Sequence, residues 1–225
     1  MSDKPSLLFQ FLFLCGAICL ITACVKSDNT DLDTKVRFIN VVDGPSQDFY
    51  LNNVLVSNSV GYGTNSAYAV TAADKLYTIL AKNTGTQNVS DSISEKLRVG
   101  RNYSVYYYKT SSQDSLLKIY EDDLTPNGDS ARVLFINLGY TLRSRVNIKT
   151  PAMTTTLGFG EKTGYISLKA DSTSKMSFNL VDSANVVDVI VPTIFSKGKT
   201  YTILIDGVTK GVGTGKLRER LITNN

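Results

Sequence analysis

The 225-residue sequence contains no histidine and no tryptophan, and it has only three cysteines and five prolines. Without histidine, general base catalysis near neutral pH would require a carboxylate or a lysine with a perturbed pKa. Zinc and transition-metal sites are built mainly from histidine and cysteine, so we expect no such metal site and no cofactor. We therefore predict that the protein is not an enzyme, and that its 12 tyrosines and 9 phenylalanines serve packing or binding.

The one long apolar run lies at the N-terminus, from Leu7 to Ala23, and follows the cation Lys4. It is shorter than the roughly 20 residues that a membrane-spanning helix needs, and its layout is typical of a secretory signal peptide. We therefore predict that residues 1–23 are removed from the mature protein.

Cys24 stands where this run gives way to small polar residues. The stretch Ile21-Thr22-Ala23-Cys24 resembles a bacterial lipobox, which predicts that Cys24 receives a diacylglycerol and becomes the mature N-terminus. Cys15 and Cys19 lie in the removed segment, so no disulfide can form within the mature chain. A free, reactive thiol at Cys24 is the alternative.

Residues 24–34 read as a flexible tether, because they are polar and show no apolar periodicity. Their acidic residues resemble the export tag of lipoproteins that reach the surface of gram-negative cells. A plain spacer explains them equally well. We expect an extracytoplasmic protein that its lipid holds at the outer membrane or cell surface.

The rest of the chain contains an internal repeat. Lys35–Asn40 recurs as Arg132–Asn137 at an offset of 97, and Gly61-Tyr62-Gly63 recurs as Gly158-Phe159-Gly160 at the same offset. Near the end of each copy, Tyr103 corresponds to Tyr201 at an offset of 98. A constant spacing across separate landmarks indicates two copies of one unit.

Each copy consists of short runs in which β-branched and aromatic residues alternate with polar ones. The sequence therefore predicts two tandem antiparallel β-sandwich domains of the immunoglobulin-like kind, over residues 35–124 and 131–225, with a linker at 125–130. Phe38, Phe135, Tyr103 and Tyr201 should be buried at equivalent positions. A phosphate-binding loop at the glycines has little support, since no Lys-Ser/Thr pair and no helix pattern follow.

These segments resemble the bacterial family of domains of unknown function numbered 4397. The resemblance rests on the strand Val36–Asn40, the segment Asp48–Asn52 with Val-Leu-Val after it, the Gly-aromatic-Gly step and the Gly-Lys/Arg-x-Tyr strand. It covers most of residues 35–224, and departs from the family at Asp43-Gly44-Pro45 and at Tyr140–Arg145. Membership implies a β-sandwich lipoprotein outside the cytoplasm and implies no known activity.

Charge is distributed unevenly between the copies. Residues 35–130 hold 9 Lys/Arg and 10 Asp/Glu, whereas residues 131–225 hold 13 and 6, for net charges of −1 and +7. A basic domain attracts polyanions such as acidic glycans, and we take Arg143, Arg145, Arg218 and Arg220 as candidate contacts. A well-solvated basic surface is the alternative. No nucleic-acid recognition motif is present, so nucleic acid is not an expected partner.

Other polar clusters have two interpretations each. The acidic stretch Glu121-Asp122-Asp123 is either a calcium site or a solvated linker edge, and adjacent strand residues converge poorly on one ion. The outer two residues of Tyr106-Tyr107-Tyr108 face solvent, for binding, or the other domain, for packing. Five Asp-Ser-x segments resemble O-glycan acceptor sites, at Ser92, Ser115, Ser130, Ser172 and Ser183. Asp-Ser is also a common start of a turn.

We therefore expect a non-catalytic, lipid-anchored cell-envelope protein with a surface-interaction or structural role, whose partner is another envelope protein or an acidic glycan. The alternative is a glycan-binding accessory lipoprotein of a nutrient-uptake system. A hydrolase with an unrecognised site is a distant third interpretation.

Overall fold

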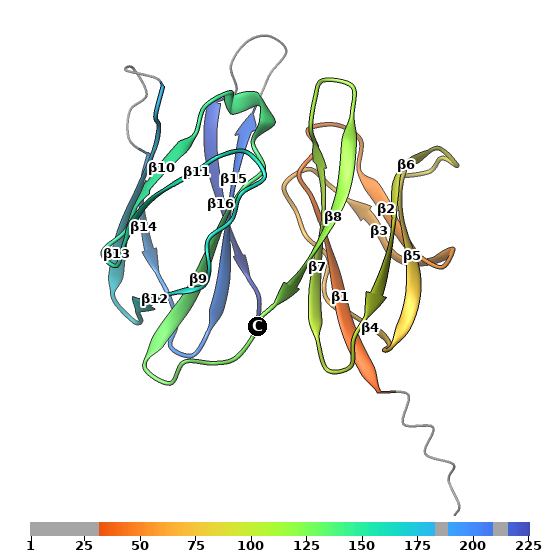
Figure 1. Ribbon diagram of the computed structural model, residues 1–225, viewed down its shortest axis with the longest axis horizontal. Coiled ribbons are helices and arrows are strands. Elements are labelled where there is room, and N and C mark those ends of the chain that lie inside the picture. Colours follow the sequence, from red (N-terminus) through yellow and green to blue (C-terminus); the bar gives the residue numbers. More distant parts are fainter. Residues whose placement is uncertain (1–31, 183–188, 209–215) are drawn as a thin grey trace, which may run out of the picture. The chain divides into compact units, whose positions relative to one another are not determined.

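The structure is a computed structural model that describes residues 32–182, 189–208 and 216–225 (Figure 1). The predicted lipidation site Cys24 and the candidate acceptor Ser183 lie outside the described residues. No helix among the described residues has the length and apolar character to cross a bilayer.

The described chain is built from short strands and one 3-10 turn. The first half contains β1 (Asp33–Asn40), β2 (Gln47–Leu51), β3 (Val54–Val60), β4 (Ala69–Ala72), β5 (Lys75–Asn83), β6 (Val89–Leu97), β7 (Asn102–Lys109) and β8 (Ser115–Asp122). The second half contains β9 (Ser130–Asn137), η1 (Tyr140–Leu142), β10 (Val146–Lys149), β11 (Thr154–Leu157), β12 (Ile166–Lys169), β13 (Thr173–Leu180), β14 (Val189–Ile194), β15 (Thr200–Val208) and β16 (Lys216–Thr223). We call β1–β8 the first sandwich and β9–β16 the second sandwich.

Each sandwich consists of two four-stranded sheets, and the strand order repeats from one sandwich to the other (Figure 1). The orders β4-β1-β7-β8 and β3-β2-β5-β6 in the first sandwich correspond to β12-β9-β15-β16 and β11-β10-β13-β14 in the second. Register repeats too, because Val36 is paired with Tyr103 and Val133 with Tyr201. The predicted all-β sandwich class is therefore confirmed.

One strand pair in each sandwich is parallel, although the sequence predicts antiparallel sheets. β1 pairs with β7 and β9 pairs with β15 in parallel, while the other pairs are antiparallel. Parallel neighbours need a long crossover connection, and β2 to β6 provide it between β1 and β7.

Left-handed backbone geometry occurs at the turns that the sequence marks. Asn52 and Asn53, between β2 and β3, have φ of 47° and 66°, the conformation of a two-residue hairpin that Asn tolerates. Gly63 and Gly160 occupy equivalent positions in the two sandwiches with φ of 74° and 78°.

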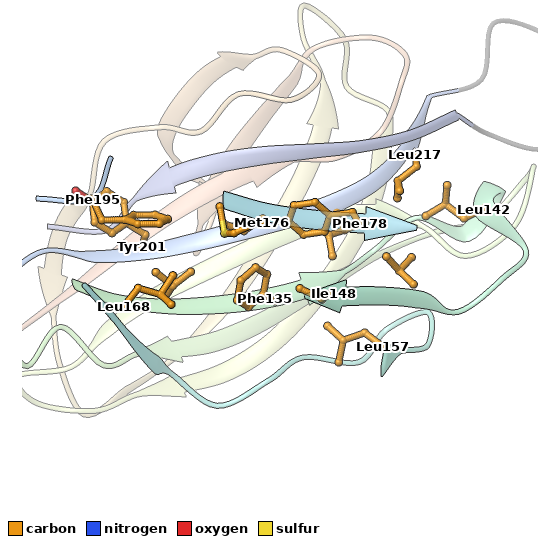
Figure 2. Packing of buried hydrophobic residues seen from close by; sticks show 14 of the residues in the cluster. Phe135, Leu142, Ile148, Leu157, Leu168, Met176, Phe178, Phe195, Tyr201 and Leu217 are labelled. Atoms are coloured by element: carbon orange, nitrogen blue, oxygen red, sulfur yellow. The ribbon is translucent and has the colours of Figure 1, made fainter. Parts of the chain in front are cut away.

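Two hydrophobic cores fill the sandwiches. In the first core Phe38 stacks on Phe49 with ring centroids 4.7 Å apart. In the second core Phe135 lies 6.2 Å from Phe178, and Phe195 lies 5.1 Å from Tyr201 (Figure 2). Phe38, Phe135, Tyr103 and Tyr201 are all buried.

A third apolar cluster joins the two sandwiches, between the sheet β4-β1-β7-β8 and the sheet β12-β9-β15-β16. Its buried members are Ile39, Val41, Tyr106, Tyr108, Leu134, Ile136, Leu138, Leu204 and Ile222. Of the three consecutive tyrosines, Tyr107 faces the first core and its two neighbours face the second sandwich. These tyrosines therefore serve packing and form no exposed binding platform.

Candidate functional site

Ionisable side chains gather where the two sandwiches meet, and Arg37 of β1 is the most deeply buried, at 1% exposure. Strand alternation points Val36 and Phe38 into the core, which directs Arg37 toward the second sandwich. Its Nη2 donates to Asn224 Oδ1 at 2.6 Å, and its Nη1 donates to the carbonyl oxygen of Thr223 at 3.0 Å. A buried arginine of the first sandwich is thus held by the end of the last strand of the second.

Asp122, at the end of β8, supplies the negative charge beside Arg37. One of its oxygens lies 3.9 Å from Arg37 Nη2 and accepts hydrogen bonds from Ser104 Oγ at 2.6 Å and Tyr68 OH at 2.7 Å. Ser104 Oγ also accepts a bond from Arg37 Nε at 2.7 Å. Burial raises the pKa of Asp122, while the nearby guanidinium opposes that rise.

A second ionic cluster lies at the other end of the interface, around the buried carboxylate of Asp206 on β15. Arg220 Nη2 donates to this carboxylate at 2.6 Å, and Arg218 Nε donates to it at 3.2 Å. Tyr62 of the first sandwich donates its hydroxyl to the same carboxylate at 3.2 Å. Both guanidiniums lie over the Tyr62 ring, that of Arg218 at 4.7 Å and that of Arg220 at 4.3 Å from the ring centroid. Burial raises the pKa of Asp206 to about 6, against the opposing effect of Arg218.

The contact of Tyr62 with Asp206 has a counterpart on the opposite side of the interface. Phe159 occupies in the second sandwich the position of Tyr62, and it packs edge-on against Tyr108, with ring centroids 5.9 Å apart. Tyr108 in turn occupies the position of Asp206, because β7 and β15 share one register. Each sandwich therefore contributes one Gly-aromatic-Gly loop to the other.

Two depressions adjoin this interface. The first, beside Asp43, Lys109, Asp206 and the turn at Gly139, has a volume of about 50 Å³, which is space for water rather than for an organic ligand. The second is an open polar depression of about 510 Å³ along residues 100–102 and 121–125.

The acidic stretch in this second depression does not converge on one point. Glu121 pairs with Arg101 at 3.1 Å, Asp122 faces Arg37, and Asp123 pairs with Arg132. The hydrogen bond from Arg132 holds the pKa of Asp123 well below its usual range. Among the described residues, no three Asp, Glu, Cys or His side chains are grouped so that they could hold a metal ion.

The four candidate polyanion contacts occupy two different environments. Arg218 and Arg220 share one face of β16, as strand alternation predicts, but Asp206 already neutralises part of their charge. Arg143 and Arg145 precede β10, so alternation does not apply to them. Arg145 pairs with Glu161 at 3.3 Å, whereas Arg143 is exposed and forms no ion pair with a described residue.

The candidate acceptor serines differ in access. Ser92 is exposed and Ser172 is half-buried at a turn. The hydroxyl of Ser115 lies 2.8 Å from that of Tyr107. A transferase must reach the hydroxyl of an acceptor serine, but Ser130 Oγ is buried and has no hydrogen-bond partner among the described residues.

Sequence reasoning missed the roles of Arg37 and Asp206. The only available signal is in the repeat, where the apolar Leu134 occupies the position of Arg37 and Tyr108 that of Asp206. Where one copy has a charged residue and the other copy has an uncharged residue at the equivalent position, the two positions have different neighbours.

The fold and these contacts define a class, namely an all-β protein of two repeat-like sandwiches joined by buried ionic clusters. The family model described as "Domain of unknown function (DUF4397)" matches residues 34–149, just over half of the chain, so the chain belongs to the DUF4397 family. No curated protein matches it.

Among solved structures, the chain is similar to CBMbc (family CBM26) from Eubacterium rectale Amy13K, crystallised in complex with maltoheptaose. The match has 7% identity and a TM-score of 0.29, and it covers 86% of this chain and 97% of that one. A likeness at this level carries no argument about the ligand of this protein.

Proposed function

We propose that the protein is a non-catalytic, lipid-anchored component of the cell envelope that presents its paired sandwiches for interaction with another envelope component. The observation that supports this most strongly is the use of its buried charges. Arg37 and Asp206 each bond a residue of the opposite sandwich, and Asp122 holds the guanidinium of Arg37 from within the first sandwich.

This use of charge favours a structural or interaction role over catalysis. A catalytic acid or base must reach a substrate, and it must do so at a site that admits the substrate. Burial raises the pKa of Asp122 and of Asp206, and both carboxylates are instead enclosed by arginine and tyrosine side chains.

Membrane attachment rests on the Ile21-Thr22-Ala23-Cys24 motif. In the native host, the wild-type chain should sediment with membranes and incorporate labelled fatty acid, whereas Cys24→Ser should be soluble or remain unprocessed. Cys19→Ser, within the predicted signal peptide, is the matched control and should leave both properties unchanged. Membrane-bound, labelled Cys24→Ser would show that this cysteine is not the anchor.

The interaction role is tested by protease treatment of intact cells, followed by chemical cross-linking through exposed lysines. A surface-displayed chain is degraded by added protease while a periplasmic marker survives, and cross-linking should yield one recurrent envelope partner. A chain protected from protease in intact cells would restrict the role to the periplasm.

A glycan-binding accessory role is the second candidate, and the outer face of the sheet β3-β2-β5-β6 favours it. There the half-buried Tyr50 lies in one cross-strand row between Leu55 and Leu80. In the second sandwich the corresponding row is Thr156, Asn147 and Asn179. An aromatic ring beside apolar side chains suits the apolar face of a sugar ring.

Titration calorimetry with neutral and acidic oligosaccharides tests the glycan role. Binding should be lost in Tyr50→Ala and retained in Asn147→Ala, which removes the corresponding residue of the second sandwich. Binding that survives Tyr50→Ala would place the glycan elsewhere, and the absence of binding by the wild type would exclude the role for those sugars.

A further inference from the structure

The two ends of the sandwiches can be told apart by the covalent chain. β1 begins at Asp33, directly after the N-terminal segment, so we call the end that contains Asp33 the tether end and the opposite end the loop end. Both sandwiches run in the same direction. Arg37, in the middle of β1, bonds Asn224 beside the start of β15, whereas Tyr62, near the end of β1, bonds Asp206 near the end of β15.

Four of the five most exposed apolar side chains lie at the tether end. Five large apolar residues are between 57% and 67% exposed, and every other exposed one is at or below 55%. These five are Leu32, Val54, Val70, Leu76 and Ile194.

Register places four of the five at this end. Leu32 precedes β1, and Val70 of β4 pairs with Lys35 near the start of β1. Leu76 is the second residue of β5, and Ile194 ends β14 opposite Thr173, the first residue of β13. Val54 lies at mid-sheet instead, because it pairs with Leu51 opposite Ile79, the fifth residue of β5. Side chains this exposed bury little of their area within the chain, and the gathering of four of them at one end indicates a contact surface.

Unpaired cations gather at the same end. They are exposed and form no ion pair with a described residue, and they comprise Lys35, Arg98, Lys169, Lys175 and Lys199. Lys169 pairs in register with Ser130 at the start of β9, and Lys199 lies in the turn before β15. Among the described residues, the acids at this end that form no ion pair are Asp33, Glu95 and Asp171, against five such cations, so the unpaired charge there is positive.

The loop end has a different character. Its arginines on β16 are partly neutralised by Asp206, and Arg145 pairs with Glu161. Cations without an ion pair to a described residue, such as Arg143 and Lys216, occur there too, but exposed acids without such a pair, at Asp43, Asp114 and Asp182, balance them. Its exposed apolar residues, such as Val89 and Leu116, are less exposed than those of the tether end.

We propose that the tether end is a membrane-contact surface, on which exposed apolar side chains enter the headgroup region of a bilayer while lysines and arginine pair with anionic lipid headgroups. This inference rests on the lipid anchor of the proposed function. Only residues 25–31 separate Cys24 from the described chain, and seven residues extend at most about 25 Å. A lipid on Cys24 therefore keeps the tether end within reach of the bilayer.

The combination of apolar and basic residues fits a bilayer better than a soluble polyanion, since a polysaccharide offers no apolar phase for Leu76 or Ile194. A basic patch beside a lipid anchor also supplies the second signal that stable anchoring needs. Each lysine near an anionic membrane strengthens binding about fivefold.

The first test uses the absence of tryptophan from the chain, which makes an introduced tryptophan the only one. Leu76→Trp and, as the matched control at the loop end, Leu116→Trp are made in the non-acylated Cys24→Ser chain. Vesicles that contain anionic phospholipid should shift the emission of Leu76→Trp to shorter wavelength and leave Leu116→Trp unchanged. Equal shifts, or no shift at position 76, would overturn the proposal.

The second test reverses charge in the same non-acylated chain. Lys169→Glu, Lys175→Glu and Lys199→Glu together should weaken co-sedimentation with anionic vesicles at least about 100-fold. The charge-matched loop-end variant, with Lys82, Lys109 and Lys216 changed to Glu, should bind nearly as well as the parent. Unchanged thermal midpoints show that both triple variants are folded.

Two further results would overturn the proposal. Equal losses of vesicle binding in the two triple variants would show that only net charge matters. If the tether-end triple variant lost binding to soluble dextran sulfate but kept its binding to vesicles, the surface would be a polyanion site. Because these measurements omit the acyl group, they can fail while the Cys24→Ser fractionation still supports the anchor, and the reverse also holds.

Discussion

The buried arginine of β1 gives the sharpest test of how the sandwiches are joined. Arg37→Leu installs the residue that the second sandwich has at the same position, Leu134. It removes the bonds to Ser104, Thr223 and Asn224 and leaves Asp122 buried without a positive partner. Breaking a buried ion pair from one side typically costs about 3–5 kcal/mol. For a protein of about 200 residues, this loss of unfolding free energy predicts a fall in thermal midpoint of about 10 °C.

The double variant Arg37→Leu/Asp122→Asn separates the cost of losing the ion pair from the cost of leaving the Asp122 carboxylate buried without a cation. Asn224 occupies in the second sandwich the position of Asp122, so this variant copies the second sandwich at both positions. It removes both buried charges, and replacing a buried ion pair with uncharged residues is often close to neutral. We therefore expect the double variant to lose about 1–3 kcal/mol less than the sum of the two single losses.

Urea unfolding followed by far-ultraviolet circular dichroism measures all four free energies of unfolding in this cycle. Strictly additive losses would refute the coupling between Arg37 and Asp122. A loss below about 1 kcal/mol for Arg37→Leu would place the arginine in the range of exposed ion pairs.

Three further predictions concern the loops, the second cluster and the serines. Gly63→Ala should be less stable in thermal melts than its counterpart Gly160→Ala, because a Cβ at position 63 would displace the Arg220 guanidinium that bonds Asp206, whereas nothing lies within 4 Å at position 160. Asp206 has a folded pKa of about 6 against 3.8, so its protonated form favours the folded state. The stability advantage of wild type over Asp206→Asn, measured by urea unfolding, should be greatest below pH 4 and decline as pH rises through about 6. In native-host protein, peptide mass spectrometry should find glycan at Ser92 rather than at Ser130, whose hydroxyl oxygen is buried; glycan at Ser130 alone would contradict this.

The fold was predictable because its signals are local and repeated. Alternation marks each strand, the 97-residue offset ties the strands into two units, and Asn52-Asn53 specifies a hairpin. The parallel pairing of β1 with β7 was not predictable in this way, since periodicity reports which face of a strand is buried and not which strand lies beside it.

The candidate site was much less accessible to sequence reasoning. Arg37 contacts a residue 187 positions away, and Tyr62 contacts one 144 positions away. No local pattern encodes such separations. The charges of Arg218 and Arg220 were visible in the sequence, but the carboxylate that neutralises them was not recognisable until β15 and β16 were placed side by side.

The interface combines two kinds of contact that we infer to act differently. Apolar equivalents, such as Ile39 and Ile136, bury area between the sandwiches, but apolar contacts are non-directional and tolerate a slip of one sheet along the other. The two ionic clusters do not tolerate it, since a slip would leave Arg37 and Asp206 buried without their partners from the opposite sandwich. Each buried hydrogen bond lost across the interface costs about 1–3 kcal/mol, so the clusters at the two ends together select one register. That single register is what places the tether ends of both sandwiches, with their exposed apolar and basic side chains, on the same side of the protein.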